Sequence, residues 1–453
     1  MRWFLGVLAV LLVALVIQSG LLAYAAYVLL AVLLVTRLLT RHGLGVVAAT
    51  REVSDDEAEV GERVEVALTL KNRGPVPLPW VLLEDLLPDY ALAARPPRLK
   101  VKGKRLQIRA LRSLQKATLK YTVGFHARGF YQIGPLVIES GDLFGLHRRY
   151  RVVAPPAYVT VYPKVVPLAG YDVMSRRPIG DVRLTHRLYE DPTRIAGVRP
   201  YEPGDPLNRV HWRATARTGK LHSKVYDPTS LAGATVVLDF HAAGYHARGE
   251  PHRSDLAVTT AASLCYAVQT LGQQVGLVTN AADAAERLSL VRYHESAEKA
   301  VDDTEGWERV RLARAETRRE AQKMRRPLQV PTRRGAEQFQ RIREMLARAE
   351  VNDGLTFAEL VVEAGPRLPR DATVIAILPA VSVETAAAVG NLKRSGYAVT
   401  VILVMIGEGE VETAYGRLAA EGVRDVRPLA SEAQLPELCS SEVNRTPYVM
   451  SLT

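Results

Sequence analysis

The chain has 453 residues, of which 48% are hydrophobic and 24% are charged. This length exceeds one compact core, and this composition excludes a wholly disordered chain, so we expect two or three domains. The formal net charge of +11 favours anionic neighbours, such as an anionic lipid surface or nucleic acid. The only cysteines are Cys265 and Cys439, which excludes a disulfide framework.

The N-terminal segment is apolar, and no charged residue lies between Trp3 and Thr36. Gln18-Ser19-Gly20 divides this run into two halves. Each half is at the short end of the ~17–25 residues of a spanning helix, which predicts a transmembrane helical hairpin over residues 1–45. Arg2 lies before the first half, and Arg37 and Arg41 lie at or after the second, which predicts a two-pass cell-membrane protein with cytoplasmic soluble domains. A secretory signal cleaved near Ala23-Tyr24-Ala25 is the alternative.

Residues 46–165 predict an all-β, immunoglobulin-like sandwich. Glu59 to Lys71 alternates polar and apolar residues, which is typical of a half-buried strand, and Asn72 to Pro75 follows as a turn. Turn residues recur at a spacing typical of sandwiches. No nucleophile, base or ligand cluster is found here, so we expect a binding or spacer domain. Further strands are expected at Trp80 to Leu83, Arg105 to Ala110, Ala117 to Phe125 and Leu136 to Glu139.

Residues 166–232 predict a connector, because prolines interrupt regular structure. Within it, Pro203-Gly204-Asp205 has the composition of a turn, and four arginines surround a tryptophan. This pattern is typical of ion pairs, cation–π contacts or oxyanion binding. Two hypotheses remain: an interdomain contact with a packed Trp212, or a docking surface for a partner. The candidate residues are Arg199, Tyr201, Pro203, Gly204, Asp205, Arg209, Trp212, Arg213 and Arg217.

Residues 233–453 alternate strands with helices, which predicts an α/β domain with a doubly wound, mostly parallel sheet. Thr235 to Asp239 is expected to be a buried strand that ends in an acid. Residues 293–334 form a charged insertion, acidic at first and then basic from Arg309 to Arg334. The other expected elements include a helix from Ser254 to Leu271, strands at Gln274 to Thr279 and Ala372 to Leu378, and a helix from Val383 to Ser395.

Three motifs resemble the DUF58 family. They are Gly124 to Tyr131, Gly141 to Leu146, and Tyr201-Glu-Pro-Gly-Asp205 followed by Val210-His-Trp-Arg-Ala-Thr-Ala-Arg217. The resemblance implies a two-helix membrane anchor, a β-sandwich and a C-terminal von Willebrand factor A-like domain. It also implies a MoxR-type AAA+ ATPase as partner, because family members are often encoded beside one, together with an unknown client protein.

The resemblance to von Willebrand factor A-like domains also implies a particular set of metal ligands. Functional A-domains hold Mg²⁺ with an Asp-x-Ser-x-Ser loop, and oxygen ligands of this kind suit that cation. Here the loop starts at Asp239, but His241 and Ala243 replace the hydroxyl residues. We therefore expect a degenerate loop and no metal or other cofactor, with Asp239 and His241 as weak candidate ligands. A transition-metal site is the alternative to a solvated loop. It would add further histidines and acids as ligands, namely His246, His252, Glu250 and Asp255.

No Gly-x-Ser-x-Gly elbow, phosphate loop or Cys-x-x-Cys pair is found in the sequence. We therefore expect that the protein is not an enzyme. The run from Arg309 to Arg334 favours a solvated charged helix, with anionic-lipid or polyanion binding as alternatives. Nucleic-acid binding is not expected, because stacking aromatics do not accompany the basic residues. The sequence thus predicts a membrane-anchored, non-enzymatic interaction or assembly protein. A metal-dependent ligand-binding protein that uses the loop after Asp239 is the alternative.

Overall fold

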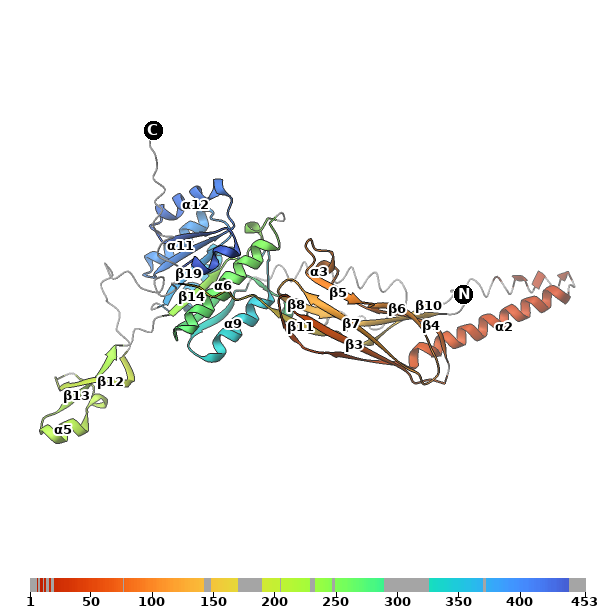
Figure 1. The fold of residues 1–453 in the computed structure, drawn as a ribbon, viewed down its shortest axis with the longest axis horizontal. Helices are drawn as coiled ribbons and strands as arrows, with labels where there is room; N and C mark the ends of the chain where they lie inside the picture. Colours follow the sequence, from red (N-terminus) through yellow and green to blue (C-terminus); the bar gives the residue numbers. More distant parts are fainter. Residues whose placement is uncertain are drawn as a thin grey trace. The chain divides into compact units, whose positions relative to one another are not determined.

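The computed structural model describes most of the chain between residues 20 and 439 and a few residues before it (Figure 1). Two compact units are present. One comprises Met1–Lys164, Ala282–Lys323 and Glu344–Glu350, and the other Val165–Ala281, Met324–Arg343 and Val351–Thr453. Outside the description are residues 1–5, 7–8, 11, 14–15, 18–19, 76, 142–147, 170–189, 204, 229–232, 247–248, 289–325, 370–371 and 440–453, and the side chains of 33, 35–44, 148, 190–196, 225–228 and 408.

The prediction of a transmembrane hairpin is wrong. Helix α2 spans Gly20–Gly43 and is followed by a short 3-10 turn, Leu44–Val46. Among the residues that the structure describes, no helix is both long and apolar enough to cross a membrane. The expected two-pass membrane localisation is corrected with it. The absence of charged residues describes only the composition of this segment. A membrane-spanning segment also needs about 20 consecutive apolar residues in one continuous helix.

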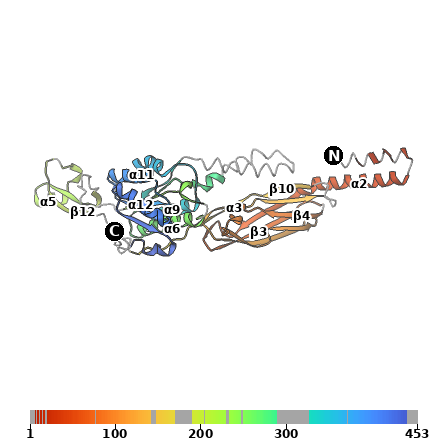
Figure 2. The same ribbon diagram turned by 90° about the horizontal axis from the view of Figure 1, so that it is seen from above.

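The first unit contains a β-sandwich built from two four-stranded antiparallel sheets (Figure 2). Their strand orders are β1-β3-β7-β5 and β10-β9-β4-β6, and a third sheet has the order β2-β11-β8. The strands are β1 Val47–Val53, β2 Glu57–Glu59, β3 Arg63–Asn72, β4 Leu78–Asp85, β5 Leu99–Gly103, β6 Leu106–Leu111, β7 Lys116–Phe125, β8 Gly129–Ile133, β9 Leu136–Gly141, β10 Arg148–Ala154 and β11 Ala157–Tyr162, with helix α3 at Asp89–Ala93.

Buried and outward-facing residues alternate along β3 and β7, and the buried residues belong to the sandwich core. Leu68 and Leu70 on β3 and Val123 and Phe125 on β7 are fully buried, and the residues between them face outward. Because successive side chains of a strand point to opposite faces, this pattern places one face of the sheet in the core. Each such aliphatic or aromatic burial contributes about 1.5–3 kcal/mol. The core therefore fixes the register of both strands, since a one-residue slip would expose the whole set.

The second unit is built on a six-stranded sheet with the order β17-β15-β14-β19-β20-β21. Five strands are parallel, and β17 pairs antiparallel with β15 at one edge. The strand β17 lies inside the expected insertion 293–334, whose residues up to 325 are outside the description. The strands are β14 Gly233–Leu238, β15 Gln274–Thr279, β17 Leu328–Arg333, β19 Ala372–Leu378, β20 Val399–Val404 and β21 Val426–Leu429.

Helices cover both faces of this sheet, and Figure 1 shows α11 and α12 on the opposite side from α6. The strand residues Val374 and Val401 pack with α10, α11 and α12 in one apolar cluster. A capping box begins α10, because Thr356 accepts from the N–H of Glu359 and the Glu359 side chain accepts from the N–H of Thr356. The helices are α6 His252–Thr270, α9 Ala336–Arg348, α10 Phe357–Ala364, α11 Val383–Arg394 and α12 Glu408–Ala420.

Candidate functional site

The predicted connector contains a small folded module. Strand β12, Glu190–Pro200, pairs antiparallel with β13, His222–Pro228, so that Arg199 lies opposite Ser223. Between them the chain forms the turn after Pro200, a 3-10 turn at Leu207–Arg209 and helix α5, Trp212–Thr218. The candidate residues of the sequence therefore lie on a hairpin and its connecting segment. We call the described residues 197–224 the signature module.

A salt bridge holds the Pro-Gly-Asp turn. The Nη2 of Arg199 lies 2.7 Å from Oδ1 of Asp205, while its contact with Glu202 is longer, at 3.6 Å. Asp205 Oδ2 accepts from the N–H of Glu202 at 3.1 Å, and Tyr201 donates its hydroxyl to the Asp205 carbonyl at 3.0 Å. The Glu202 N–H and then Arg199 hold the pKa of Asp205 below its usual range. The carboxylate thus ties strand β12 to the turn.

Helix α5 is fixed at both ends. His211 caps it, because Nδ1 accepts from the N–H of Ala214 at 3.0 Å. The backbone N–H of His211 donates to the His222 carbonyl at 2.8 Å, which anchors the cap to β13. Gly219 ends the helix with φ of 69°, the left-handed conformation that glycine adopts most easily. The orientation of this seven-residue helix is therefore set by the hairpin.

Whether Trp212 packs in an interdomain contact or is bound by a partner stays a prediction. The Trp212 side chain is 69% exposed, and Leu207 is 73% exposed. The Arg213 and Arg217 side chains, one turn apart on α5, are also exposed, and Arg209 is half-buried. Of the other candidates, Pro203 is exposed and Gly204 lies outside the described residues. The module thus presents an aromatic residue and cationic side chains to solvent.

The candidate metal ligand Asp239 lies in a hydrogen-bonded network at the carboxyl end of β14. Its side chain is buried, and Oδ1 accepts from Nδ2 of Asn280 at 2.9 Å and from the N–H of His241 at 3.2 Å. Asn280 also accepts from the N–H of Phe240 at 2.6 Å and donates to the Leu355 carbonyl at 2.8 Å. Burial raises the pKa of Asp239, with Asn280 and His241 opposing the rise.

These contacts do not resemble a cation site. The amide of Asn280 donates to Oδ1 of Asp239, and Nδ1 of His241 accepts from the N–H of Ala243 at 3.3 Å. In the described part of the chain, no three histidine, cysteine or acidic side chains are grouped to hold a metal ion. Neither Mg²⁺ nor a transition metal therefore gains support from the described loops. The absence of a cofactor stays a prediction.

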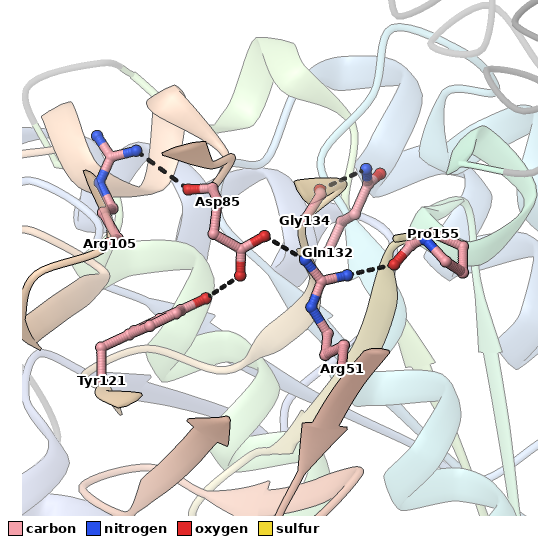
Figure 3. Close-up of polar contacts among 7 residues, drawn as sticks. All are labelled: Arg51, Asp85, Arg105, Tyr121, Gln132, Gly134 and Pro155. Atoms are coloured by element: carbon pink, nitrogen blue, oxygen red, sulfur yellow. Dashed lines mark hydrogen bonds and ion pairs between the residues drawn. The ribbon is translucent and has the colours of Figure 1, made fainter. Parts of the chain in front are cut away.

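A buried ion pair in the sandwich was missed by the sequence analysis (Figure 3). Arg51 on β1 contacts the carboxylate of Asp85 on β4 and the Pro155 carbonyl, and Tyr121 on β7 donates to the other oxygen of Asp85 at 2.5 Å. The Arg51 and Asp85 side chains are 4% and 0% exposed. Burial raises the pKa of Asp85, although Arg51 and Tyr121 oppose it. The one available signal was a charged residue at an inward position of each strand.

The chain is a multidomain protein with a β-sandwich, an α/β unit and an exposed Arg/Trp module that lies between their strands in sequence. Residues 197–301 match the family described as "Protein of unknown function DUF58". The chain is also 24% identical over 254 residues to the uncharacterized protein YeaD of Bacillus subtilis, over 56% of this chain and 61% of YeaD. The match thus spans less than two thirds of YeaD. The predicted resemblance to the DUF58 family is confirmed over residues 197–301.

Comparison with solved structures gives low similarity over parts of the chain. The CARDB domain of a Pyrococcus furiosus protein in complex with di-metal ions is 13% identical, with a TM-score of 0.18, over 25% of this chain and 91% of that one. Proximal thread matrix protein 1 from the mussel byssus is also 13% identical, with a TM-score of 0.28, over 45% of each chain. Likenesses at this level carry no inference about function.

Proposed function

We propose that this chain is a non-enzymatic interaction or assembly protein, and that the signature module docks a protein partner. One observation carries the proposal: Trp212 is 69% exposed on a helix fixed at both ends. Tryptophan and arginine are enriched among the residues that dominate binding energy at interfaces. A large exposed aromatic side chain on a rigid support loses little conformational entropy on binding. The composition of the module and the exposure of Trp212 on it therefore support docking.

The partner we propose is a MoxR-type AAA+ ATPase, acting with this chain on a client protein. The support is the resemblance to the DUF58 family, which implies such a partner and which the family match covers over residues 197–301. The cationic Arg213 and Arg217 favour a partner with an acidic surface, because complementary charge accelerates association and fixes orientation. The alternative of metal-dependent ligand binding has no supporting contact among the described residues. The polyanion alternative concerns a basic run of which residues 309–325 lie outside the description.

Direct binding of the purified full chain to the purified MoxR-type ATPase of the same organism tests this proposal. Trp212→Ala should weaken the complex at least tenfold, or about 1.4 kcal/mol. Val362→Ala is the matched control, because Val362 is a 77% exposed apolar residue on α10, away from the module in sequence. Both variants should keep the melting temperature, since neither side chain is buried. No binding by the wild-type chain, or equal binding by Trp212→Ala, would reject the proposal.

A further inference from the structure

The edge strand β6 differs from the other edges of the sandwich. Strands at sheet edges carry unpaired backbone groups, and charged residues usually protect them from pairing with another chain. By contrast β6 reads Leu-Gln-Ile-Arg-Ala-Leu, with Leu106 51% exposed and Ile108 70% exposed. Among the described strands, β6 pairs with β4 only. The other edges carry Lys100 and Lys102 on β5, Arg148, Arg149 and Arg151 on β10, and Glu52 on β1, whereas Arg109 is the one charged residue of β6.

The outer face of this sheet is also largely apolar, with one glutamate in each of two neighbouring rows. Register places Ile108, Leu82, Glu139 and Tyr150 in one row across the four strands. The next row contains Leu106, Glu84, Val137 and Val152, on the same face. Tyr150 and Val152 are 41% and 51% exposed. The outer face of β3 and β7, by contrast, carries lysines and threonines in the ordinary way.

The sequence of β6 is self-complementary in one antiparallel register. With a two-fold axis at Ile108, Ile108 faces its own copy and Leu106 faces Ala110 of the second chain. Gln107 then lies opposite Arg109. Directly opposed residues share a face, so the apolar residues stay on the outer face and the polar pair on the inner one. Among the described residues, the side-chain oxygen of Gln107 is buried without a hydrogen-bond partner, and a guanidinium opposite it would supply a donor.

We infer that β6 pairs with β6 of a second copy of this chain, joining two four-stranded sheets in a two-fold dimer. Isologous pairing of this kind is the commonest route to a closed dimer. Beyond the strand, the same register brings Lys104 opposite Arg112, which opposes like charges at both ends of the pair. Salt screens such exposed charges. Dimerisation should therefore tighten as salt is added, unlike association driven by ion pairs.

Sedimentation of the purified full chain gives the first test. The wild-type chain should show a concentration-dependent dimer, and Ile108→Lys should raise its dissociation constant about tenfold or more, because two lysines would oppose each other at the axis. Val362→Lys, at a comparably exposed apolar position on α10, should leave the dimer unchanged. A wild-type chain that stays monomeric at every accessible concentration, or a dimer insensitive to Ile108→Lys, would overturn the inference.

Disulfide cross-linking tests the register itself. Ile108→Cys places two thiols opposite each other with Cα atoms about 4.5–5.5 Å apart, within disulfide range. Leu106→Cys is the matched control, because its copies would lie four residues apart, about 14 Å along the strands. The native Cys265 and Cys439 are buried, and burial raises the pKa of Cys439 to about 11, so background oxidation should be low. Equal cross-linking of both variants would indicate non-specific edge association and reject this dimer.

Discussion

The guanidinium of Arg199 lies 2.7 Å from the carboxylate of Asp205, and this contact closes the turn that precedes the exposed Trp212. Asp205 also accepts from the backbone of Glu202, so one side chain holds both the strand and the turn. Charge-assisted hydrogen bonds of this kind are short and directional. The conformation of this turn therefore depends on Asp205, whose side chain is 14% exposed.

Asp205→Ala should loosen this turn without unfolding the chain. The N–H of Glu202 loses its acceptor, so its hydrogen-exchange protection should fall at neutral pH. Glu202→Gln is the control, because Glu202 is 77% exposed and its contact with Arg199 is long. The depressed pKa of Asp205 means that its contribution is present above the unfolded value of about 3.9 and is lost as pH falls through the lower folded value. An unchanged exchange rate in Asp205→Ala would contradict this account.

Asp85→Asn should destabilise the sandwich strongly. The change replaces one of the two acceptor oxygens by a donor amide, so either Arg51 or Tyr121 loses its acceptor, and a buried group left unsatisfied costs about 1–3 kcal/mol. Chemical denaturation of the full chain, followed by a probe in the sandwich, measures the loss. Glu84→Gln on the same strand removes only an exposed pair with Arg105 at 3.5 Å and should cost ~1 kcal/mol or less. Equal effects of the two variants would refute the buried pair.

The stability of the sandwich should depend on pH through the ionisation of Asp85. Its folded pKa is raised by burial, so the folded state binds the proton more tightly than the unfolded state does. The contribution of Asp85 to stability should therefore be fully present below its unfolded pKa of about 3.9. This contribution should be lost as pH rises through the raised folded pKa. Melting temperatures measured from acid to neutral pH should show this decline in the wild type and lack it in Asp85→Asn. Parallel curves would contradict the assignment.

Gly134→Ala should destabilise the sandwich more than Gly61→Ala does. Both glycines have positive φ, 92° and 100°, so both substitutions cost backbone strain of about 1–3 kcal/mol. A Cβ on Gly134 would also overlap the guanidinium of Arg51, whereas nothing lies within 4 Å of one on Gly61. The difference between the two free energies of unfolding thus isolates the steric contact with Arg51. Equal losses would show that Arg51 can move aside freely.

Asn280→Ala should destabilise the α/β unit by about 3 kcal/mol or more. It removes the acceptor of the Phe240 N–H and the donor to Asp239, and buried groups left unsatisfied cost about 1–3 kcal/mol each. Asn208→Ala, at an exposed position, should have little effect. Thermal unfolding of both variants provides the comparison. A melting temperature close to that of the wild type in Asn280→Ala would show that water replaces these bonds without loss.

The local sequence determined many individual elements. The expected strand from Ala372 to Leu378 has the same bounds as β19, and the helix expected from Val383 coincides with α11. The alternation of polar and apolar residues from Glu59 to Lys71 predicted a strand, and β3 lies over most of this range. These predictions succeed because the side-chain period reports which face of an element is buried. The same reasoning gave the DUF58 resemblance, since its motif is contiguous, but it failed for the transmembrane hairpin and missed β12 and β17.

Only the tertiary structure decided which distant residues meet. Asp85 is 34 residues from Arg51 and 36 from Tyr121, and Asn280 is 41 residues from Asp239. No local period encodes such pairs, because strand order and loop closure bring them together. The exposure of Trp212 and the edge position of β6 are decided in the same way. An apolar pattern in the sequence predicts burial, and only the arrangement of neighbouring elements leaves Trp212 and Ile108 uncovered.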